Sequence, residues 1–139
     1  YITIDRGSDD GIALGMPVVA SQGLVGRVVE SYPRSSRVLL ITDVSSSVNA
    51  LIQNSRATGV IQGKPGGGVV MRYIQQGEEV KVGDLVLTSG LGGNFPRRLV
   101  IGQVTAVRQK DIELFQEAEV EPTVEFGHLE MVMIITDFE

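Results

Sequence analysis

One strand–glycine motif occurs twice in this sequence, and it limits the folds open to the chain more than any other feature. The first copy spans residues 15–24 (GMPVVASQGL) and the second spans residues 83–91 (GDLVLTSGL). Each copy follows a strand-like segment, at 1–5 and 69–74, and leads into a further strand that begins with Gly. A repeat of this kind predicts two similar folding units in one chain.

The glycines and serines of the motif have a structural interpretation. A Gly opens each strand where the chain turns tightly, and the Ser-Gln-Gly or Ser-Gly sequence then forms a hairpin turn that needs positive φ. The Gly at the head of the next strand permits a bulge or sharp bend, as the corners of small barrels require. We therefore predict structural turn roles for Gly15, Gly23, Gly26, Gly83, Ser89, Gly90 and Gly102. The alternative is a chance similarity between two hairpins.

The rest of the sequence is also typical of strands. Short apolar runs rich in Val and Ile are bounded by Gly, Ser, Asp or Pro, and none keeps a 3.6-residue period. Residues 38–43 align with 120–125, and residues 48–52 align with 132–135, so the similarity extends beyond the motif. These patterns predict an all-β protein of two tandem, small, six-stranded antiparallel β-barrels with little or no helix. Single helical turns are expected only at 111–118 and 126–130.

A Gly-rich stretch, GKPGGG at 63–68, is the expected boundary between the two barrels, because it is flexible and lacks apolar anchors. The first barrel is then expected at 1–62 and the second at 69–139. Residues 58–61 have no clear counterpart in the second copy and are expected to run between the domains. The sequence leaves open whether the last strand stays in the second barrel or packs back on the first.

The composition argues against several kinds of site. The chain has no cysteine, which removes disulfides, thiolate metal sites and Cys nucleophiles. Its one histidine cannot build a typical zinc site without Cys partners, and the acidic pairs at 9–10 and 78–79 lack EF-hand spacing. We therefore expect no metal and no cofactor. A net charge of −5 and a pI near 4.9 speak against nucleic-acid binding, which needs a basic face.

A two-barrel protein invites comparison with serine proteases. Their triad needs a His within hydrogen-bond reach of a Ser, and a carboxylate that orients the His. The only histidine is His128, near the end of the chain, whereas the chymotrypsin order needs one in the first barrel. Ser89 is better explained as a turn residue, because Ser21 occupies the same place in the first copy. We predict no enzyme activity, and a degenerate two-barrel serine hydrolase is the alternative.

A loop after the second motif is a candidate contact site. Arg97 and Arg98 form a local basic spot directly after Phe95-Pro96. One interpretation is a partner-contact loop in which Phe95 is an aromatic anchor beside Arg97 and Arg98. The alternative is an ordinary solvated loop with two charges.

The residues of both motif copies resemble the rod shape-determining protein MreC family. The resemblance rests on GMPV at 15–18, GLVGRV at 23–28 and SRVLLITD at 36–43. It continues with VGDLVLTSGLGG at 82–93 and the tail around 120–132, so it covers nearly the whole chain. One departure is that the family usually has a Gly after its Phe-Pro-Lys position, where this chain has Arg98.

The resemblance implies a fold and a function. The fold would be two six-stranded barrels distantly like those of chymotrypsin, without a catalytic centre. The function would be a scaffold of the cell-wall elongation machinery that controls cell shape by binding and regulating peptidoglycan synthases. The implied partners are a class B penicillin-binding transpeptidase and the MreD, RodZ, RodA and MreB proteins, together with other copies of the chain as a homo-oligomer.

The resemblance also implies a location. Members of the family have a cytoplasmic tail, one membrane helix and a coiled coil before an extracytoplasmic β region. The chain starts at Tyr1 rather than Met and inside a strand-like segment, so we interpret it as that β region of a longer protein. It would lie in the periplasm or on the cell-wall side, held at the cytoplasmic membrane only through an N-terminal anchor that this sequence lacks.

Overall fold

The computed structural model describes residues 1–109 and 114–136. Its strands are β1 (Ile2–Ile4), β2 (Pro17–Ala20), β3 (Gly23–Ser31), β4 (Ser36–Leu40), β5 (Ser47–Ile52), β6 (Thr58–Gly63), β7 (Val69–Gln75), β8 (Leu85–Thr88), β9 (Val100–Arg108), β10 (Phe115–Pro122) and β11 (Met133–Ile134). The only helical elements in the described residues are the 3₁₀ turns Ser8–Asp10 and Phe126–His128. The predicted all-β class is therefore confirmed.

Of the two predicted helical turns, the one at 126–130 is found as the short 3₁₀ turn Phe126–His128. The other, at 111–118, is wrong over residues 115–118, which lie in β10, and its residues 111–113 lie outside the described residues. No helix in the described ranges has the length and apolar character needed to cross a bilayer.

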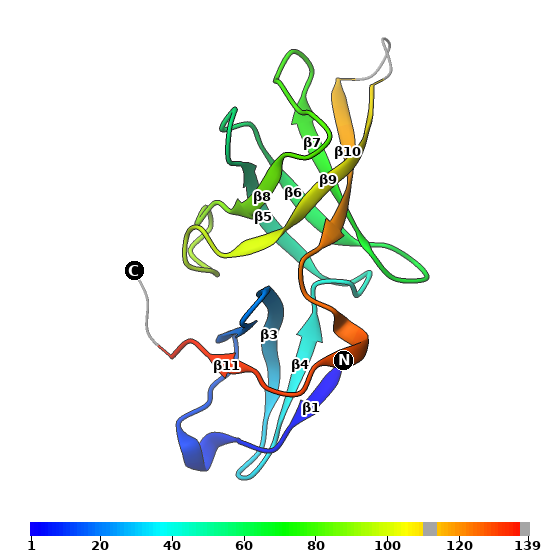
Figure 1. Ribbon diagram of the computed structural model, residues 1–139. Coiled ribbons are helices and arrows are strands. Elements are labelled where there is room, and N and C mark those ends of the chain that lie inside the picture. Colours follow the sequence, from blue (N-terminus) through cyan, green and yellow to red (C-terminus); the bar gives the residue numbers. More distant parts are fainter. Residues whose placement is uncertain (110–113, 137–139) are drawn as a thin grey trace.

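Two antiparallel sheets make up the molecule. Six strands close into a barrel in the order β10-β7-β6-β5-β8-β9. The other five, in the order β1-β4-β3-β2-β11, form a curled open sheet that we call the half-barrel. Figure 1 shows the closed barrel above the half-barrel. The prediction of two six-stranded barrels thus holds for one unit, whereas the other has five strands and two free edges, β1 and β11.

The internal repeat is visible in the hydrogen bonds of the two sheets. The Gly15 N–H donates to the Val28 carbonyl at 2.8 Å, and the Gly83 N–H donates to the Val104 carbonyl at 2.8 Å. Both glycines have positive φ, 87° and 96°, which suits a residue without a Cβ. The two motif copies thus enter their sheets through the same backbone geometry.

Two further glycines lie where neighbouring strands come closest. Gly26 of β3 pairs with β2 and β4, and Gly102 of β9 pairs in the same way with β8 and β10. A Cβ built on Gly26 would overlap the carbonyl oxygen of Leu39, and one on Gly102 would overlap that of Glu121. Register shifts next to both positions bend the sheets there, as bulges do in small barrels.

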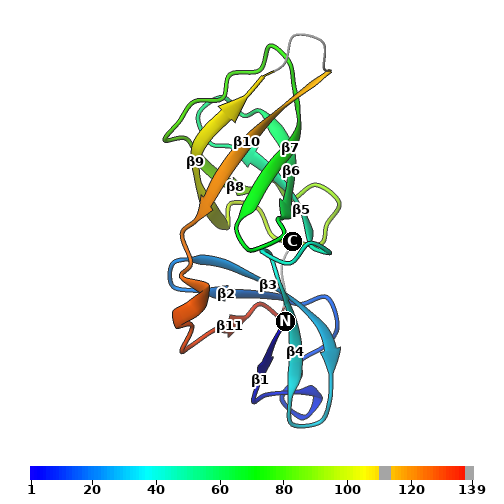
Figure 2. The same cartoon turned by 90° about the vertical axis from the view of Figure 1, so that its right-hand side faces the viewer.

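The strands that follow the two motif copies are exchanged between the sheets. β5 follows the first copy but pairs with β8 of the second, with Ile52 opposite Val86. β11 follows the second copy but pairs with β2 of the first, with Ile134 opposite Val18. Figure 2 shows the two crossings, in which β4 leads up into β5 and β10 leads down towards β11. The last strand, whose place the sequence left open, therefore belongs to the half-barrel.

This exchange corrects the expected membership of the strands. Residues 47–62 were expected in the first barrel, but β5 and β6, which contain them, belong to the closed barrel instead. The Gly-rich stretch 63–68 is the hairpin turn between β6 and β7, where Gly63 pairs with Val69 and the Lys64 N–H donates to the Gly68 carbonyl. Gly66, Gly67 and Gly68 all have positive φ, so these glycines serve a tight turn rather than a flexible linker.

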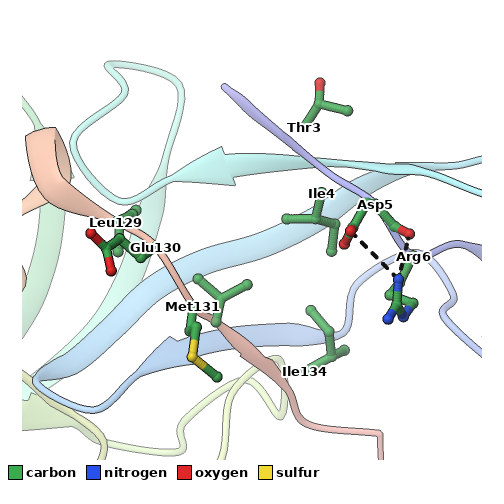
Figure 3. A pocket seen from close by; sticks show the side chains of 9 residues that line it. Thr3, Ile4, Asp5, Arg6, Leu129, Glu130, Met131 and Ile134 are labelled. Carbon is green, nitrogen blue, oxygen red and sulfur yellow. Dashed lines mark hydrogen bonds and ion pairs between the residues drawn. The ribbon is translucent and has the colours of Figure 1, made fainter.

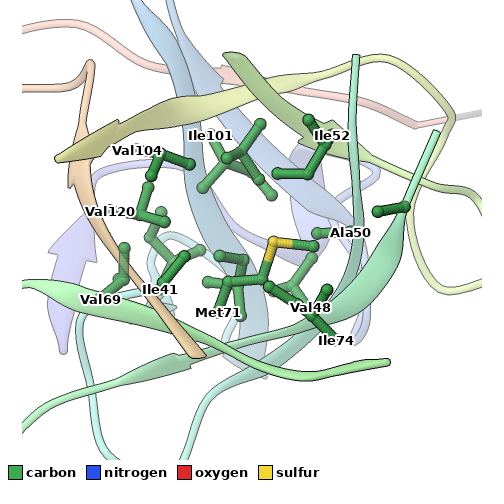
Figure 4. Close-up of a cluster of buried hydrophobic side chains, with 14 of the residues drawn as sticks. Ile41, Val48, Ala50, Ile52, Val69, Met71, Ile74, Ile101, Val104 and Val120 are labelled. Atoms are coloured by element: carbon green, nitrogen blue, oxygen red, sulfur yellow. The ribbon is translucent and has the colours of Figure 1, made fainter. Parts of the chain in front are cut away.

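The barrel and the half-barrel each enclose their own apolar core. In the barrel the inward residues of all six strands meet, and Figure 4 shows Ile52, Met71 and Ile101 at the centre. The half-barrel core is smaller and is built around Val18, Val25, Val28 and Val38. Each fully buried aliphatic side chain contributes about 1.5–3 kcal/mol, so the larger core makes the barrel the more firmly held unit.

The strand-crossing glycines give a stability prediction. Replacing Gly26 or Gly102 with Ala forces a methyl group into a backbone carbonyl, so each variant should lose about 3 kcal/mol of unfolding free energy or fail to fold. Gly127→Ala is the matched control, because nothing lies within 4 Å of a Cβ at that position. Urea unfolding compares the three variants. A Gly26→Ala or Gly102→Ala protein as stable as Gly127→Ala would contradict this account of the repeat.

Candidate partner-binding surfaces

The open edges of the half-barrel border a groove. Its cavity volume is about 580 Å³, and its walls are residues 3–6 on one side and residues 129–132 with Ile134 on the other. Figure 3 shows Ile4 and Ile134 between the two chain segments, with Asp5 and Arg6 paired at one end. Met131 is 85% exposed, so the groove presents an apolar side chain to solvent.

The groove occupies the place of a missing strand. In the closed barrel β6 fills the position between β5 and β7. By the repeat, β11 corresponds to β5 and β1 corresponds to β7, and no strand of the described chain lies between them. The sequence carried a signal of this, because residues 58–61 in β6 had no counterpart in the second copy. The lining residues themselves were not predicted.

The predicted contact loop lies on the closed barrel, between β8 and β9. Buried Thr88 fixes the loop, since its hydroxyl donates to the Pro96 carbonyl at 2.6 Å and accepts from the Leu99 N–H at 2.9 Å. Phe95, predicted as an aromatic anchor of the contact loop, is only 7% exposed and packs in the barrel core. The ring instead attaches the loop to the barrel from inside.

Arg97 and Arg98 lie at the surface of that loop. They line a cavity of about 440 Å³ together with Arg56, which comes from the turn between β5 and β6. Arg97 packs over Gly90, where a Cβ would lie 2.5 Å from the Arg97 Cγ. Sequence reasoning missed Arg56, since nothing in the sequence indicates that residues about forty positions apart meet across this end of the barrel.

Ser89 lies in the same cavity in the turn role proposed for it. Its N–H donates to the Asn49 carbonyl at 3.0 Å, and its hydroxyl oxygen accepts from the Leu91 N–H at 3.2 Å. No histidine lines this cavity. His128 instead lines a separate cavity with Ser21 and Glu125, and no hydrogen bond joins those three side chains in the described residues.

Among the described residues, two surface groups have shifted pKa values, and both lie away from these cavities. Hydrogen bonding to Glu79 raises the pKa of Lys81, and hydrogen bonding to Glu30 raises the pKa of Tyr32. Both are exposed charge-assisted contacts of a kind common on protein surfaces. Among the described residues no group of three or more acidic or histidine side chains is placed to hold a metal ion.

The strand order defines an all-β domain of one closed barrel and one half-barrel, and the comparisons with known proteins agree with this fold. The family model for the rod shape-determining protein MreC, barrel core, matches residues 1–136. The cell shape-determining protein MreC of Listeria monocytogenes is 33% identical over 139 residues, which cover 96% of this chain. The chain belongs to the MreC family, whose members are non-catalytic cell shape proteins. It spans less than half the length of that relative, 47%.

Solved structures of the family have the same fold. The crystal structure of MreC from Pseudomonas aeruginosa is 31% identical with a TM-score of 0.91, covering 96% of this chain and 87% of that one. A structure of the major periplasmic domain of MreC is 26% identical with a TM-score of 0.74, covering 88% of this chain and 77% of that one. A complex of penicillin-binding protein PBP2 and MreC from Helicobacter pylori matches at 24% identity and a TM-score of 0.65, covering 76% and 65%, which supports the fold alone.

The turn geometry of Ser89 gives a prediction about reactivity. With no histidine beside it, the hydroxyl has no general base, so a fluorophosphonate probe should not label the protein. Ser89→Ala should change the unfolding free energy by at most about 1 kcal/mol, the value of one turn hydrogen bond. Labelling that disappears in Ser89→Ala would revive the hydrolase alternative.

Proposed function

We propose that this chain is the extracytoplasmic binding domain of a scaffold for bacterial cell-wall elongation. It would control cell shape by binding a class B penicillin-binding transpeptidase and regulating its activity. Family membership supports the cell-shape role. The choice of partner follows the Helicobacter pylori MreC, which forms a complex with PBP2. The location follows the relative described as a periplasmic domain.

The observation that carries the proposal is the open half-barrel. Every strand of the closed barrel is hydrogen-bonded to a neighbour on both sides. β1 and β11 are therefore the only free strand edges in the described part of the chain. Free edges beside an apolar groove favour binding by strand addition, in which backbone hydrogen bonds give affinity and side-chain contacts give specificity. The groove between residues 3–6 and 129–134 is therefore the proposed transpeptidase contact.

Regulation needs no chemistry from this chain. A transpeptidase with an inactive and an active conformation shifts towards whichever state the scaffold binds more tightly. A tenfold preference for the active state is worth about 1.4 kcal/mol, which a few groove contacts supply.

The proposal extends to the remaining expected partners of the whole protein. We propose MreD, RodZ, RodA and MreB as further members of the same assembly, and anchoring in the cytoplasmic membrane through residues outside this sequence. Self-association into a homo-oligomer is part of the same proposal. Sedimentation of this chain as a strict monomer at high concentration would leave assembly to other parts of the protein.

A charge placed in the groove tests the proposed contact. Met131→Glu puts a carboxylate on an 85% exposed position of the groove, so it should leave the fold intact and weaken transpeptidase binding about tenfold or more. Val82→Glu is the matched control, since Val82 is 68% exposed and lies outside the groove. Biolayer interferometry against the transpeptidase of the same organism measures both.

Three outcomes of the binding measurement distinguish the possible contact surfaces. Weakening by Met131→Glu alone supports the groove. Equal binding by both variants and the unchanged protein would move the contact to another surface, and no binding by the unchanged protein would remove the transpeptidase as partner.

A further inference from the structure

Three arginines meet in the cavity at the loop end of the closed barrel. Arg97 and Arg98 come from the loop between β8 and β9, and Arg56 comes from the turn between β5 and β6. All three are exposed, and no acidic residue lines the cavity with them. This local excess of three positive charges occurs in a chain whose net charge is −5.

The three guanidinium groups have no partner within the described residues. The other lysines and arginines in the described part of the closed barrel each pair with a Glu; they are Lys64, Arg72, Lys81 and Arg108. Arg56, Arg97 and Arg98 form no ion pair and no side-chain hydrogen bond there. Like charges held together without counter-charges attract an anionic ligand.

The backbone of the cavity adds an independent observation. Only three non-glycine residues in the described chain have positive φ, and two of them are Arg56 at 67° and Arg98 at 65°. This left-handed conformation favours glycine and costs free energy for a residue with a side chain. Strained residues of this kind are frequent at ligand-binding sites. The surrounding structure holds them in the unfavourable conformation, which positions their side chains for the ligand.

The walls of the cavity indicate what kind of anion fits. Leu51, Leu87 and Leu91 line it beside the arginines, and Leu91 is 61% exposed. A free phosphate uses the guanidinium groups and leaves these apolar walls uncovered. A peptide segment with carboxylate and aliphatic side chains uses both, since Arg binds carboxylates through two parallel hydrogen bonds.

We propose that Arg56, Arg97 and Arg98 form a binding site for an acidic, Leu-containing peptide segment of a partner protein. The site lies on the closed barrel and is separate from the half-barrel groove, so the chain has two contact surfaces of different chemistry. The proposal rests on the scaffold function only for the identity of the protein that carries the segment.

Synthetic peptides test the site without the transpeptidase, so its failure is distinguishable from failure of the groove. The intact protein is titrated into dye-labelled EELEE peptide, with QQLQQ as the neutral match, and binding is followed by fluorescence anisotropy. We expect saturable binding of EELEE only, weakening as salt increases. Arg98→Gly should reduce the affinity about tenfold, whereas Arg34→Gln, an exposed arginine outside the cavity, should not.

Arg98→Gly also separates binding from folding. Because glycine accepts the left-handed backbone without strain, this variant should unfold at a temperature equal to or about 3 °C above that of the unchanged protein while binding the peptide less well. Absence of EELEE binding would overturn the proposal, as would equal loss in Arg34→Gln. Displacement of the peptide by inorganic phosphate at equal concentration, or preferential binding of phosphatidylglycerol vesicles, would also overturn it.

Discussion

The close approach of backbone strands at Gly26 and Gly102 is the constraint on which the rest of the molecule depends. At each glycine a strand passes directly over the carbonyl of its neighbour, which leaves no room for a Cβ. The resulting bends curl both sheets around their apolar cores, one into a closed barrel and the other into a half-barrel. The same close approach occurs in both copies of the motif, so it curves both the closed barrel and the half-barrel.

The exchange of strands turns two equal sequence copies into two unequal units. The first copy gives β5 to the barrel and receives β11, while β6 joins the barrel as well. The barrel thereby has six strands and closes, so none of its strands has a free edge. In the half-barrel, β1 and β11 keep free edges beside a groove. The surface proposed to bind a partner is thus a consequence of how strands are shared, rather than of any special residue in the groove.

Much of this was predictable from the sequence, and what was not has a physical reason. Short Val- and Ile-rich runs gave the all-β class, and the Gly15 and Gly83 positions gave the repeat, because both depend on local backbone geometry. The sheet that β5 joins was not predictable, since its alternating apolar pattern buries equally well against β2 or β8. The 63–68 glycines were mistaken for a linker because a flexible segment and a hairpin turn both favour glycine.

The loop between β8 and β9 was likewise only partly predictable from the sequence. Arg97 and Arg98 were identified from their sequence position, but the burial of Phe95 and the arrival of Arg56 depend on tertiary packing. The central claim is that the unpaired edges of the half-barrel bind the partner, and amide hydrogen exchange with and without the transpeptidase tests it most directly. We expect new protection of the amides at residues 2–6 and 129–134, with exchange in the strands of the closed barrel unchanged. Protection confined to the closed barrel, with the edges of β1 and β11 still exchanging freely, would contradict it.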